Sequence, residues 1–567
     1  MADGIHDTAE LEYDVIVVGS GAAAFAGALG AIDEGMTVLM VESTEKFGGN
    51  TAMSGGGLWL PNNPLMQREG AADSREEALT YLEETIGEPG RSSNRARKEA
   101  FVDGIADYVL TTEKYGFRWV RAAAYPDYYP ELPGGKVGRS IELKPVDAKA
   151  MGRWRKLSRG LLPFPMMNSD MFLLGRPWST WSGFWAGVRL VFRTLGGLVR
   201  GKILVGMGAA LAASLARAVV VEGGVPLWLN APAERLVMDG DRVVGVEVRR
   251  EGKPVTVRAR HGVLLAAGGF DQDKERRKRL QGVEGNPAGS PGAWGKGIDM
   301  AVEAGAALEY MEDAWWGATV KPVEGGLSSF MVGERSMPYS LIVDKDGRRF
   351  ANESESYVDL GHHMLEHDGA AGPYWFILDG RYTKRYFLTF GVDPKANKKM
   401  AAQGIRQTAD TIDELAEKIG VDAANLRAEI DKFNGFARTG RDQDFARGDS
   451  AYDRYYGDPT IHPNNNLAPI EKGPFTAYET VIGDLGTKGG VVTDEHARAL
   501  REDGSVIEGL YSAGNNSAAV MGHTYPGPGS TIGPASVFGL IAARHMAGSR
   551  ASSTAAASED DVAVDAG

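Results

Sequence analysis

The first 42 residues of the chain contain a series of elements in an order that few folds accommodate. Tyr13 to Val18 is a short, continuously apolar run, typical of a buried strand in a parallel sheet. The turn Gly19-Ser20-Gly21-Ala22-Ala23-Ala24 follows, and then an alanine-rich segment that predicts a helix ending at Gly35. A second strand, Thr37 to Val41, leads directly to Glu42. Strand, glycine turn, helix, strand and acid in this order predict a dinucleotide-binding domain.

Each part of this motif has a physical reason. Gly19 permits the tight turn, and Gly21 lets the backbone approach a pyrophosphate. The small Ala24 lets the helix pack on the strand, so that its first amides face the phosphates. Glu42 accepts hydrogen bonds from ribose hydroxyls. Because an acid repels a 2′-phosphate, Glu42 favours FAD or NAD over NADP.

Further glycine-rich segments favour FAD over NAD. Phe47 to Thr51 and Ser54 to Gly57 follow the acid closely and offer backbone that can pass beneath a flavin. A hairpin over 234–250 leads to a buried strand ending in small residues at 262–269, and 509–515 repeats that theme. The predicted cofactor-binding residues are Gly19, Gly21, Ala22, Ala23, Glu42, Ser43, Gly48, Gly49, Asn50, Thr51, Ser54, Gly55, Gly56, Ala267, Gly268, Gly514, Asn515, Gly529 and Ile532.

These strands predict an α/β fold in which both ends of the chain build one Rossmann-like FAD domain. With 567 residues, the chain is too long for a single ordinary core. We expect an N-terminal FAD part at 1–270, an inserted α+β catalytic domain at 271–481, a C-terminal FAD part at 482–549 and a disordered Ala/Ser/Asp-rich tail at 550–567. Within the inserted domain, the patterns predict a strand pair at 341–350 and helices at 411–420 and 423–436.

Composition excludes several classes of function. The net charge of -13 argues against a nucleic-acid partner, which requires a basic face. The absence of cysteine excludes disulfides and thiolate metal sites, and with the acidic, polar start it favours a cytoplasmic protein. His363, Glu366 and His367 match a zinc-binding pattern, but no further ligand is evident in the sequence. We therefore predict no metal site.

Several motifs together resemble a known family. They are Phe47-Gly48-Gly49, Tyr125-Pro126-Asp127-Tyr128-Tyr129, Asn352-Glu353-Ser354 with Tyr357, Asp484-Leu485-Gly486-Thr487-Lys488-Gly489-Gly490, and Tyr525-Pro526-Gly527-Pro528-Gly529. On these residues the chain resembles flavoproteins of the fumarate reductase/succinate dehydrogenase superfamily, and within it the 3-ketosteroid Δ1-dehydrogenases. The resemblance extends from about Tyr13 to about Met546, with a gap near 150–205.

The resemblance implies a desaturation of the steroid A ring, as in steroid degradation. The Tyr525 hydroxyl and the Gly529 backbone N–H would hold the 3-keto oxygen, Tyr357 would remove a proton from carbon 2, and Tyr128 would polarise Tyr357. Carbon 1 would give a hydride to flavin N5, and an external acceptor, a quinone, would reoxidise the flavin. No histidine follows Gly49 where covalent members of the superfamily carry one, so FAD should be non-covalent.

Elementary chemistry supports these roles. Hydride loss from an unactivated carbon requires charge to develop on the ketone oxygen, and a well-placed donor contributes ~3 kcal/mol to that stabilisation. Tyrosine, with a free pKa of ~10, is a weak base that needs a second hydroxyl or a positive field. The pair Tyr128 and Tyr357 provides the second hydroxyl. We expect Trp315-Trp316 to line the steroid pocket, although core packing explains the pair nearly as well.

Two other readings remain open. The chain could be another oxidoreductase of the superfamily, either fumarate-reductase-like or a 4,5-desaturating steroid dehydrogenase. A dicarboxylate would need converging arginines at the flavin, and the motifs here offer Tyr and Trp. In a different class, it could be a membrane-bound steroid-binding flavoprotein without turnover.

The segment 161–204 is a basic, aromatic island in an acidic chain. It holds Trp178, Trp181, Phe184, Trp185 and Phe192 among several arginines, and Asp170 is its only acid. Arg189 and Arg193 interrupt the ~20 uncharged residues that a spanning helix needs. Core packing with solvated arginines is one explanation. We favour a peripheral segment on the cytoplasmic membrane face, which suits substrates with an alkyl tail such as cholest-4-en-3-one.

Overall fold

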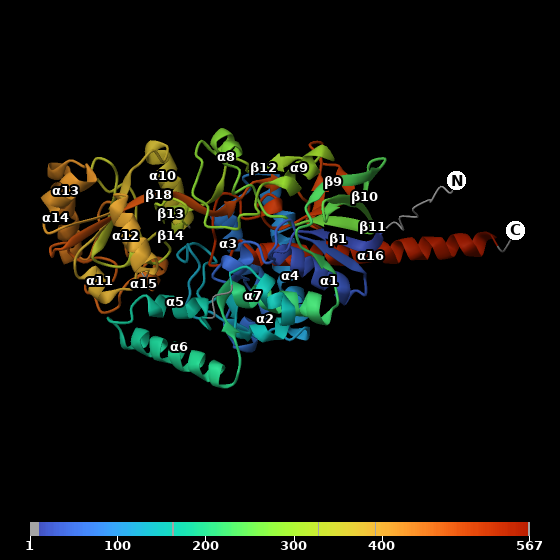
Figure 1. Cartoon of the computed structure of the whole chain (residues 1–567), viewed down its shortest axis with the longest axis horizontal. Coiled ribbons are helices and arrows are strands. Elements are labelled where there is room, and N and C mark those ends of the chain that lie inside the picture. The colour runs from blue at the N-terminus through green and yellow to red at the C-terminus, as the bar shows by residue number, and fades with distance from the viewer. Residues whose placement is uncertain (1–10, 161–163, 327, 392, 565–567) are drawn as a thin grey trace.

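The computed structural model describes residues 11–160, 164–326, 328–391 and 393–564, with backbone alone for 368 and 549–564. Figure 1 shows two parts side by side, one around β1 and the other around β18, with the helices α5 and α6 along one edge. The helices are α1 Ala22–Asp33, α2 Pro64–Arg68, α3 Arg75–Ile86, α4 Arg95–Lys114, α5 Asn168–Leu174, α6 Trp181–Val199, α7 Met207–Ala216, α8 Lys274–Gln281, α9 Lys296–Glu303, α10 Tyr357–Asp368, α11 Tyr382–Arg385, α12 Pro394–Ala402, α13 Ile412–Ile419, α14 Ala423–Thr439, α15 Ala451–Tyr456 and α16 Ile532–Val564.

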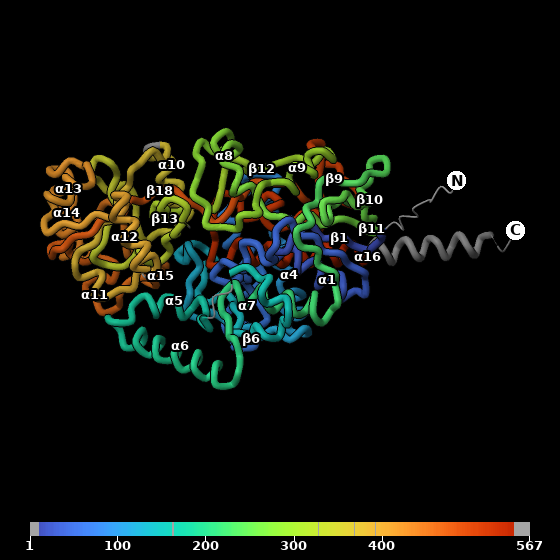
Figure 2. The backbone as a smooth tube through the Cα atoms, viewed as in Figure 1, coloured from blue at the N-terminus to red at the C-terminus, as the bar shows by residue number. Residues whose placement is uncertain are grey.

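The first part is built on a sheet ordered β20-β21-β11-β1-β2-β8, with the hairpin β9–β10 attached to β11. Its strands are β1 Leu11–Val18, β2 Val38–Val41, β8 Leu227–Trp228, β9 Ala233–Asp239, β10 Arg242–Arg250, β11 Lys253–Leu265, β20 Arg498–Leu500 and β21 Val506–Ser512. β1 pairs in parallel with β2 and β11, and β11 pairs in parallel with β21. The predicted α/β fold is confirmed, and the C-terminal strand β21 returns to the N-terminal sheet. Figure 2 shows the C-terminal helix α16 beside α1 as well.

Helix α1 packs closely on this sheet and on α16. A Cβ atom at Gly27 would lie 2.4 Å from Leu264 of β11, and one at Gly30 would lie 2.6 Å from Leu540 of α16. The glycines therefore allow the close approach that we had expected Ala24 to provide, although Ala24 is fully buried there. This packing holds the N-terminus of α1 at the carboxyl ends of the central strands.

The second part holds a mostly antiparallel sheet ordered β14-β13-β18-β16-β15, with β17 paired to β18. Its strands are β13 Ala314–Val320, β14 Ser329–Phe330, β15 Ser340–Val343, β16 Tyr374–Leu378, β17 Arg406–Ala409 and β18 Phe475–Thr487. The two predicted helices are present as α13 and α14, and Thr411 and Glu414 form a capping box at the start of α13. The smaller strands are β3 Leu58–Trp59, β4 Trp119–Arg121, β5 Ser140–Leu143, β6 Val146–Asp147, β7 Leu204–Val205, β12 Leu308–Glu309 and β19 Gly490–Val491.

The predicted strand pair at 341–350 is wrong. Only β15 forms, and it pairs with β16 rather than with the residues that follow it. The Asp344 carboxylate accepts from the backbone N–H of Asp346 and Arg348, both at 2.9 Å, and so stabilises a tight turn. Beyond the turn, Arg349 leaves the sheet to pair with the buried Glu353 and Asp442.

Two of the expected domain boundaries fall inside continuous secondary-structure elements. β18 runs from Phe475 to Thr487, so the division that we placed between 481 and 482 falls inside a strand. The backbone of α16 continues to Val564, and the side chains of the expected tail at 550–567 lie outside the described residues. Disorder in that tail stays a prediction.

The described part of the island, residues 164–204, contains the two helices α5 and α6. α6 turns small residues, Gly183, Ala186 and Gly197, toward the protein. Its large apolar residues point outward: Trp181 is 79% exposed and Phe192 is 70% exposed. Within the described part of the chain, no helix combines the length and the apolar character needed to cross a membrane.

Candidate active site

The turn after β1 leaves room for a ligand at the start of α1. Gly19 has a φ of 113°, and a Cβ there would lie 2.2 Å from the Ala266 carbonyl oxygen, so the fold itself requires glycine. At Gly21, a Cβ would meet only the Thr51 hydroxyl, at 3.6 Å. Gly21 is therefore free of a packing constraint, and its missing side chain opens the space in front of the helix.

Glu42 ends the second strand and is held by its neighbours. One carboxylate oxygen accepts from the Ser20 hydroxyl at 2.5 Å, and the other accepts from the Thr44 amide at 2.9 Å. Glu42 also lines the cavity described below. Its fixed carboxylate fits the ribose hydroxyls of a dinucleotide.

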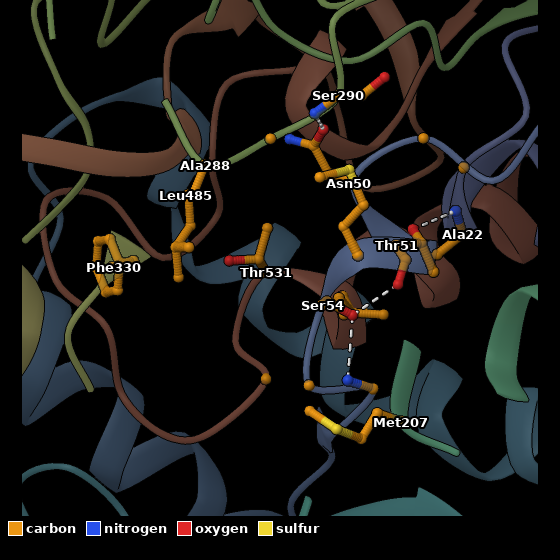
Figure 3. Close-up of a pocket in the computed structure, with 18 of the residues that line it drawn as sticks. Ala22, Asn50, Thr51, Ser54, Met207, Ala288, Ser290, Phe330, Leu485 and Thr531 are labelled. Carbon is orange, nitrogen blue, oxygen red and sulfur yellow. Dashed lines mark hydrogen bonds between the residues drawn. The ribbon is translucent and has the colours of Figure 1, made fainter. Parts of the chain in front are cut away.

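A single cavity of about 1220 Å³ begins at this turn and ends at the three predicted tyrosines. Figure 3 shows part of its wall, where Ala22 donates to Thr51 and Ser54 lies beside Thr51. It is lined by all the predicted site residues except Gly48: Gly19, Gly21, Ala22, Ala23, Glu42, Ser43, Gly49, Asn50, Thr51, Ser54, Gly55, Gly56, Tyr128, Ala267, Gly268, Tyr357, Gly514, Asn515, Tyr525, Gly529 and Ile532. The glycine cradle, the fixed acid and the volume of this cavity fit FAD.

Gly48 serves the turn instead of lining the cavity. Its φ is 108°, and a Cβ there would lie 2.7 Å from the Ala52 methyl group. Its N–H donates to the Ser20 carbonyl oxygen at 3.1 Å. Gly48 therefore holds the segment that places Gly49 and Asn50 at the cavity.

The sequence reasoning missed the loop 286–297, which closes the cavity opposite Thr51. The Asn50 amide oxygen accepts from the Ser290 N–H at 2.6 Å and so joins the two segments (Figure 3). The Asn50 amide nitrogen donates to the Asp271 carboxylate at 3.0 Å. Ala288, Ser290 and Trp294 line the cavity from this loop. Its run of Gly, Pro and Ser from Gly285 to Gly292 was the available signal.

Tyr128, Tyr357 and Tyr525 meet at the far end of the cavity. The ring centroids are 5.6 Å apart for Tyr128 and Tyr357, 5.0 Å for Tyr357 and Tyr525, and 5.1 Å for Tyr128 and Tyr525. All three rings are buried, at 3–5% exposure. Three segments far apart in the sequence thus bring three phenols together.

A buried ion cluster positions Tyr128. The carboxylate of Asp127 accepts from Trp59 at 2.7 Å and pairs with Arg139 at 2.8 Å, and burial raises the pKa of Asp127 to about 6. The Tyr128 N–H donates to the Pro526 carbonyl oxygen at 2.9 Å. The backbone carrying Tyr128 is thereby tied to the loop that carries Tyr525.

Neighbouring tyrosines have other partners. Tyr129 donates to the Asp359 carboxylate at 2.9 Å, and the Tyr125 hydroxyl pairs with that of Tyr456. Tyr125 also lines the cavity. Of the three tyrosines in this motif, Tyr128 is the one that contacts the rings of both Tyr357 and Tyr525.

Tyr357 begins helix α10 and lies against Phe330, with ring centroids 5.2 Å apart. Burial raises its pKa well above the usual value, and the neighbouring Tyr525 adds to this rise. The hydroxyl of Tyr128 acts in the opposite direction and lowers the pKa of Tyr357. Burial also raises the pKa of Tyr128 well above its usual value.

A charged cluster lies behind these tyrosines. The buried Asp313 carboxylate pairs with His362, Lys488 and His523, each at 2.9 Å. Despite its burial, these partners hold the pKa of Asp313 well below its usual range. His362 belongs to the helix of Tyr357, and His523 precedes Tyr525 by two residues.

The structure also bears on two further features of the sequence, the Trp315-Trp316 pair and the zinc-like histidine motif. The prediction that Trp315 and Trp316 line the steroid pocket is wrong, because both are buried outside the cavity lining. Trp315 packs behind Tyr525, with ring centroids 5.3 Å apart, and Trp316 lies under Arg277. In the zinc-like motif, His363 bonds Glu355 and His367 bonds Asp344, so the two imidazoles have separate acidic partners.

Comparison with known proteins agrees with this architecture. The family described as "FAD binding domain" matches residues 14–532. The chain is 44% identical to the 3-oxosteroid 1-dehydrogenase of Mycolicibacterium smegmatis, over 96% of this chain and 98% of that one. It is 34% identical to a 4-oxocyclohexanecarboxylate 2-dehydrogenase of Sinomonas cyclohexanicum, over 95% of this chain and 93% of that one.

A solved structure shares the whole fold. It is the 3-ketosteroid Δ1-dehydrogenase of Sterolibacterium denitrificans in complex with 1,4-androstadiene-3,17-dione, with a TM-score of 0.88 and 36% identity, covering 95% of this chain and all of that one. A flavocytochrome c3 fumarate reductase, at 22% identity and a TM-score of 0.63, shares the fold. The chain is thus an FAD-dependent oxidoreductase and belongs to the family of the 3-oxosteroid 1-dehydrogenases.

Proposed function

We propose that this enzyme desaturates the bond between carbons 1 and 2 of neutral 3-ketosteroids. The observation that carries the proposal is the meeting of Tyr128, Tyr357 and Tyr525 at one end of the cavity whose other end fits the dinucleotide. The similar dehydrogenases of Mycolicibacterium smegmatis and Sterolibacterium denitrificans carry the same activity in their names. When bound, FAD supplies the two-electron acceptor for the hydrogen that leaves carbon 1.

The Tyr525 hydroxyl and the Gly529 N–H hold the ketone oxygen in this proposal. Gly529 has a φ of 101°, and a Cβ there would lie 2.3 Å from the Gly57 carbonyl oxygen, so no other residue fits. Two donors fixed in a water-poor site stabilise the charge that develops on the oxygen, each by ~3 kcal/mol. That stabilisation makes the hydrogens of carbon 2 acidic enough for a side-chain base.

Tyr357 takes the proton from carbon 2. Its raised pKa makes its phenolate a strong base, but it also keeps the phenol protonated at neutral pH. Tyr128 offsets part of this cost, because its hydroxyl stabilises the phenolate of Tyr357. Tyr128 is therefore assigned a supporting role, one step away from the substrate.

The lining of the cavity favours an apolar, uncharged substrate. The lining includes Met171, Phe172, Phe330 and Met337, and the ring of Phe330 packs on Tyr357. Among the described lining residues, Lys296 alone is basic, and it is next to Gly297, which packs on Ala267 at the cofactor end. A dicarboxylate or a cyclohexane carboxylate would lack a cationic partner near the tyrosines.

The test is anaerobic reduction of the bound flavin by candidate substrates. A 3-ketosteroid with a short side chain should bleach the flavin and yield a product with a new 1,2 double bond, whereas succinate and 4-oxocyclohexanecarboxylate should not. Reoxidation by an added quinone then tests the proposed acceptor. Reduction by succinate, or a double bond formed at carbons 4 and 5, would refute the assignment.

We further propose that α6 and its flanks attach the enzyme to the cytoplasmic face of a membrane. Trp178, Trp181 and Phe192 are 70–79% exposed, and water is an unfavourable surrounding for such large apolar rings. Phe164 and Trp178 also line the steroid cavity, so its apolar rim lies beside this helix. A lipid-soluble sterol with an alkyl tail would then reach the cavity from the bilayer.

Flotation with vesicles tests this attachment. Trp181→Ser/Phe192→Ser should move the enzyme from the vesicle fraction to the soluble fraction. Leu110→Ser, which removes an exposed apolar residue from α4, is the control and should float like the wild type. If the wild-type enzyme fails to float with any vesicle, α6 has no role at a membrane.

A further inference from the structure

A second pocket, of about 640 Å³, lies where the end of α6 meets the segment 148–160. Four cationic side chains line it: Lys46, Arg155, Lys156 and Lys202. Its remaining lining is mostly apolar and includes Leu198 and Ile203. The pocket takes no part in the desaturation, because it shares no lining residue with the steroid cavity.

The four cations of this pocket have no acidic partner within ion-pair distance among the described residues. The stretch 145–204 contains ten Lys or Arg and two acids, in a chain whose net charge is -13. Neither acid forms an ion pair with these four cations: Asp170 pairs with Arg193 at 2.9 Å, and Asp147, beside the pocket, accepts from the Ile203 N–H at 3.0 Å. Converging positive charges repel one another, and a bound anion would relieve that repulsion.

The surroundings of the pocket indicate which kind of anion fits it. Leu190 of α6 lines the steroid cavity, whereas Thr194 and Leu198, one and two turns further on, line the basic pocket. Leu198 and Val199 at its edge are 62% and 88% exposed. A ligand with a compact anion and an apolar tail would place the anion among the cations and the tail along α6.

We propose that this pocket binds the phosphate of an anionic lipid headgroup. The inference rests on the proposed membrane attachment of α6 and adds a defined polar contact to it. A phosphate offers several oxygens to several cations at once. In a zwitterionic headgroup, the positive group offsets the charge of the phosphate and weakens its attraction to the cations. Headgroup binding at Thr194 and Leu198 would hold Leu190, and with it the cavity rim, against the lipid.

The test compares vesicle partition of the full-length FAD-loaded enzyme and of Lys156→Glu/Lys202→Glu, without steroid. Wild type should bind vesicles of phosphatidylcholine with phosphatidylglycerol at least about tenfold more tightly than vesicles of phosphatidylcholine alone, and salt should weaken this preference. The double variant should lose the preference and keep its binding to neutral vesicles through α6. The matched control is Lys278→Glu/Arg279→Glu on α8, which changes the net charge equally on the opposite edge of the molecule in Figure 1.

Each other outcome overturns the proposal. If the control variant loses the preference as fully as the double variant, overall charge explains it and the pocket does not. If inorganic phosphate at the same phosphate concentration competes the vesicles off and binds wild type equally well, the ligand is free phosphate and not a lipid. Turnover of a short-chain 3-ketosteroid in vesicle-free buffer, measured on the same proteins, separates these results from a failure of the proposed desaturation.

Discussion

The ammonium group of Lys488 donates to the backbone carbonyl oxygen of His523 at 2.5 Å, two residues before Tyr525. Lys488 is fully buried, and its charge is balanced by Asp313 at 2.9 Å. Its Nζ also lies 5.0 Å from the ring of Trp315, which in turn packs on Tyr525. Lys488 therefore acts as a positioning residue for the loop that carries the proposed carbonyl anchor.

Lys488→Met should remove the contacts that hold the Tyr525 loop in place, while FAD stays bound. Leaving Asp313 without its buried cation should lower the free energy of unfolding by roughly 3–5 kcal/mol. The rate of flavin reduction per bound flavin should fall at least about tenfold, because small misplacements of a reacting group are costly. Lys488→Arg should recover part of that rate. An unchanged rate per flavin in stopped flow would leave Lys488 with a purely structural role.

Gly21→Ala should separate cofactor binding from folding. The new methyl group meets only the Thr51 hydroxyl at 3.6 Å, so the fold should tolerate it, while the group fills the space that a pyrophosphate needs. We expect a folded protein with little flavin absorbance. Gly19→Ala is the contrasting variant, since its methyl group would clash with Ala266 and should lower the melting temperature as well. Full flavin content in Gly21→Ala would disprove the predicted cradle.

The tyrosine roles are tested by three Tyr→Phe variants and a control. Tyr357→Phe and Tyr525→Phe should each slow flavin reduction by orders of magnitude, because each removes a hydroxyl and keeps the ring. Tyr128→Phe should be milder, as it touches the reaction through Tyr357. Tyr129→Phe removes a hydroxyl that donates to Asp359 and not to any of the three site tyrosines, so this variant should stay near the wild-type rate. A near-normal rate for Tyr357→Phe would exclude it as the base.

The pH dependence of the reductive step follows from the raised pKa of Tyr357. The phenolate is the active form, and its fraction grows about tenfold per pH unit as long as the pH is below the pKa. Because burial raises that pKa well above the usual value, the rate should still be rising at about pH 10. Stopped-flow reduction at saturating steroid measures this, with the residual rate of Tyr357→Phe expected to be flat. A plateau near neutral pH would contradict the assignment.

Local patterns predicted the FAD part of the fold well. β1, α1, β2, the β9–β10 hairpin and β21 lie where apolar runs and glycine turns placed them. The failure at 341–350 has a clear cause, because Asp344 and Arg349 satisfy side-chain contacts that an alternating pattern does not reveal. Pairing of β15 with β16 joins residues that are 32 to 38 positions apart, so a local pattern cannot predict it.

The candidate site shows the same division. The local constraints of the dinucleotide turn predicted Gly19 and Glu42, and the resemblance to a known family predicted the three tyrosines; all five residues line one cavity. The roles of Asp313 and Lys488 could not be predicted, since they arise only where α10 and the Tyr525 loop converge in space. The prediction for Trp315 was wrong because the sequence of an aromatic pair is the same whether the pair lines a pocket or packs in the core.

The unbroken strand β18 limits how the enzyme can open. It begins at Phe475 in the outer sheet, pairs there with β16, and ends at Thr487, whose hydroxyl accepts from the Phe270 amide beside the cofactor end. A hinge motion of one half against the other would have to twist this strand and break its ladder with β13. We therefore expect the two halves to move together. Steroid entry and exit would then depend on small displacements at the rim near α5 and α6, and mobility measured there should set the rate of product release.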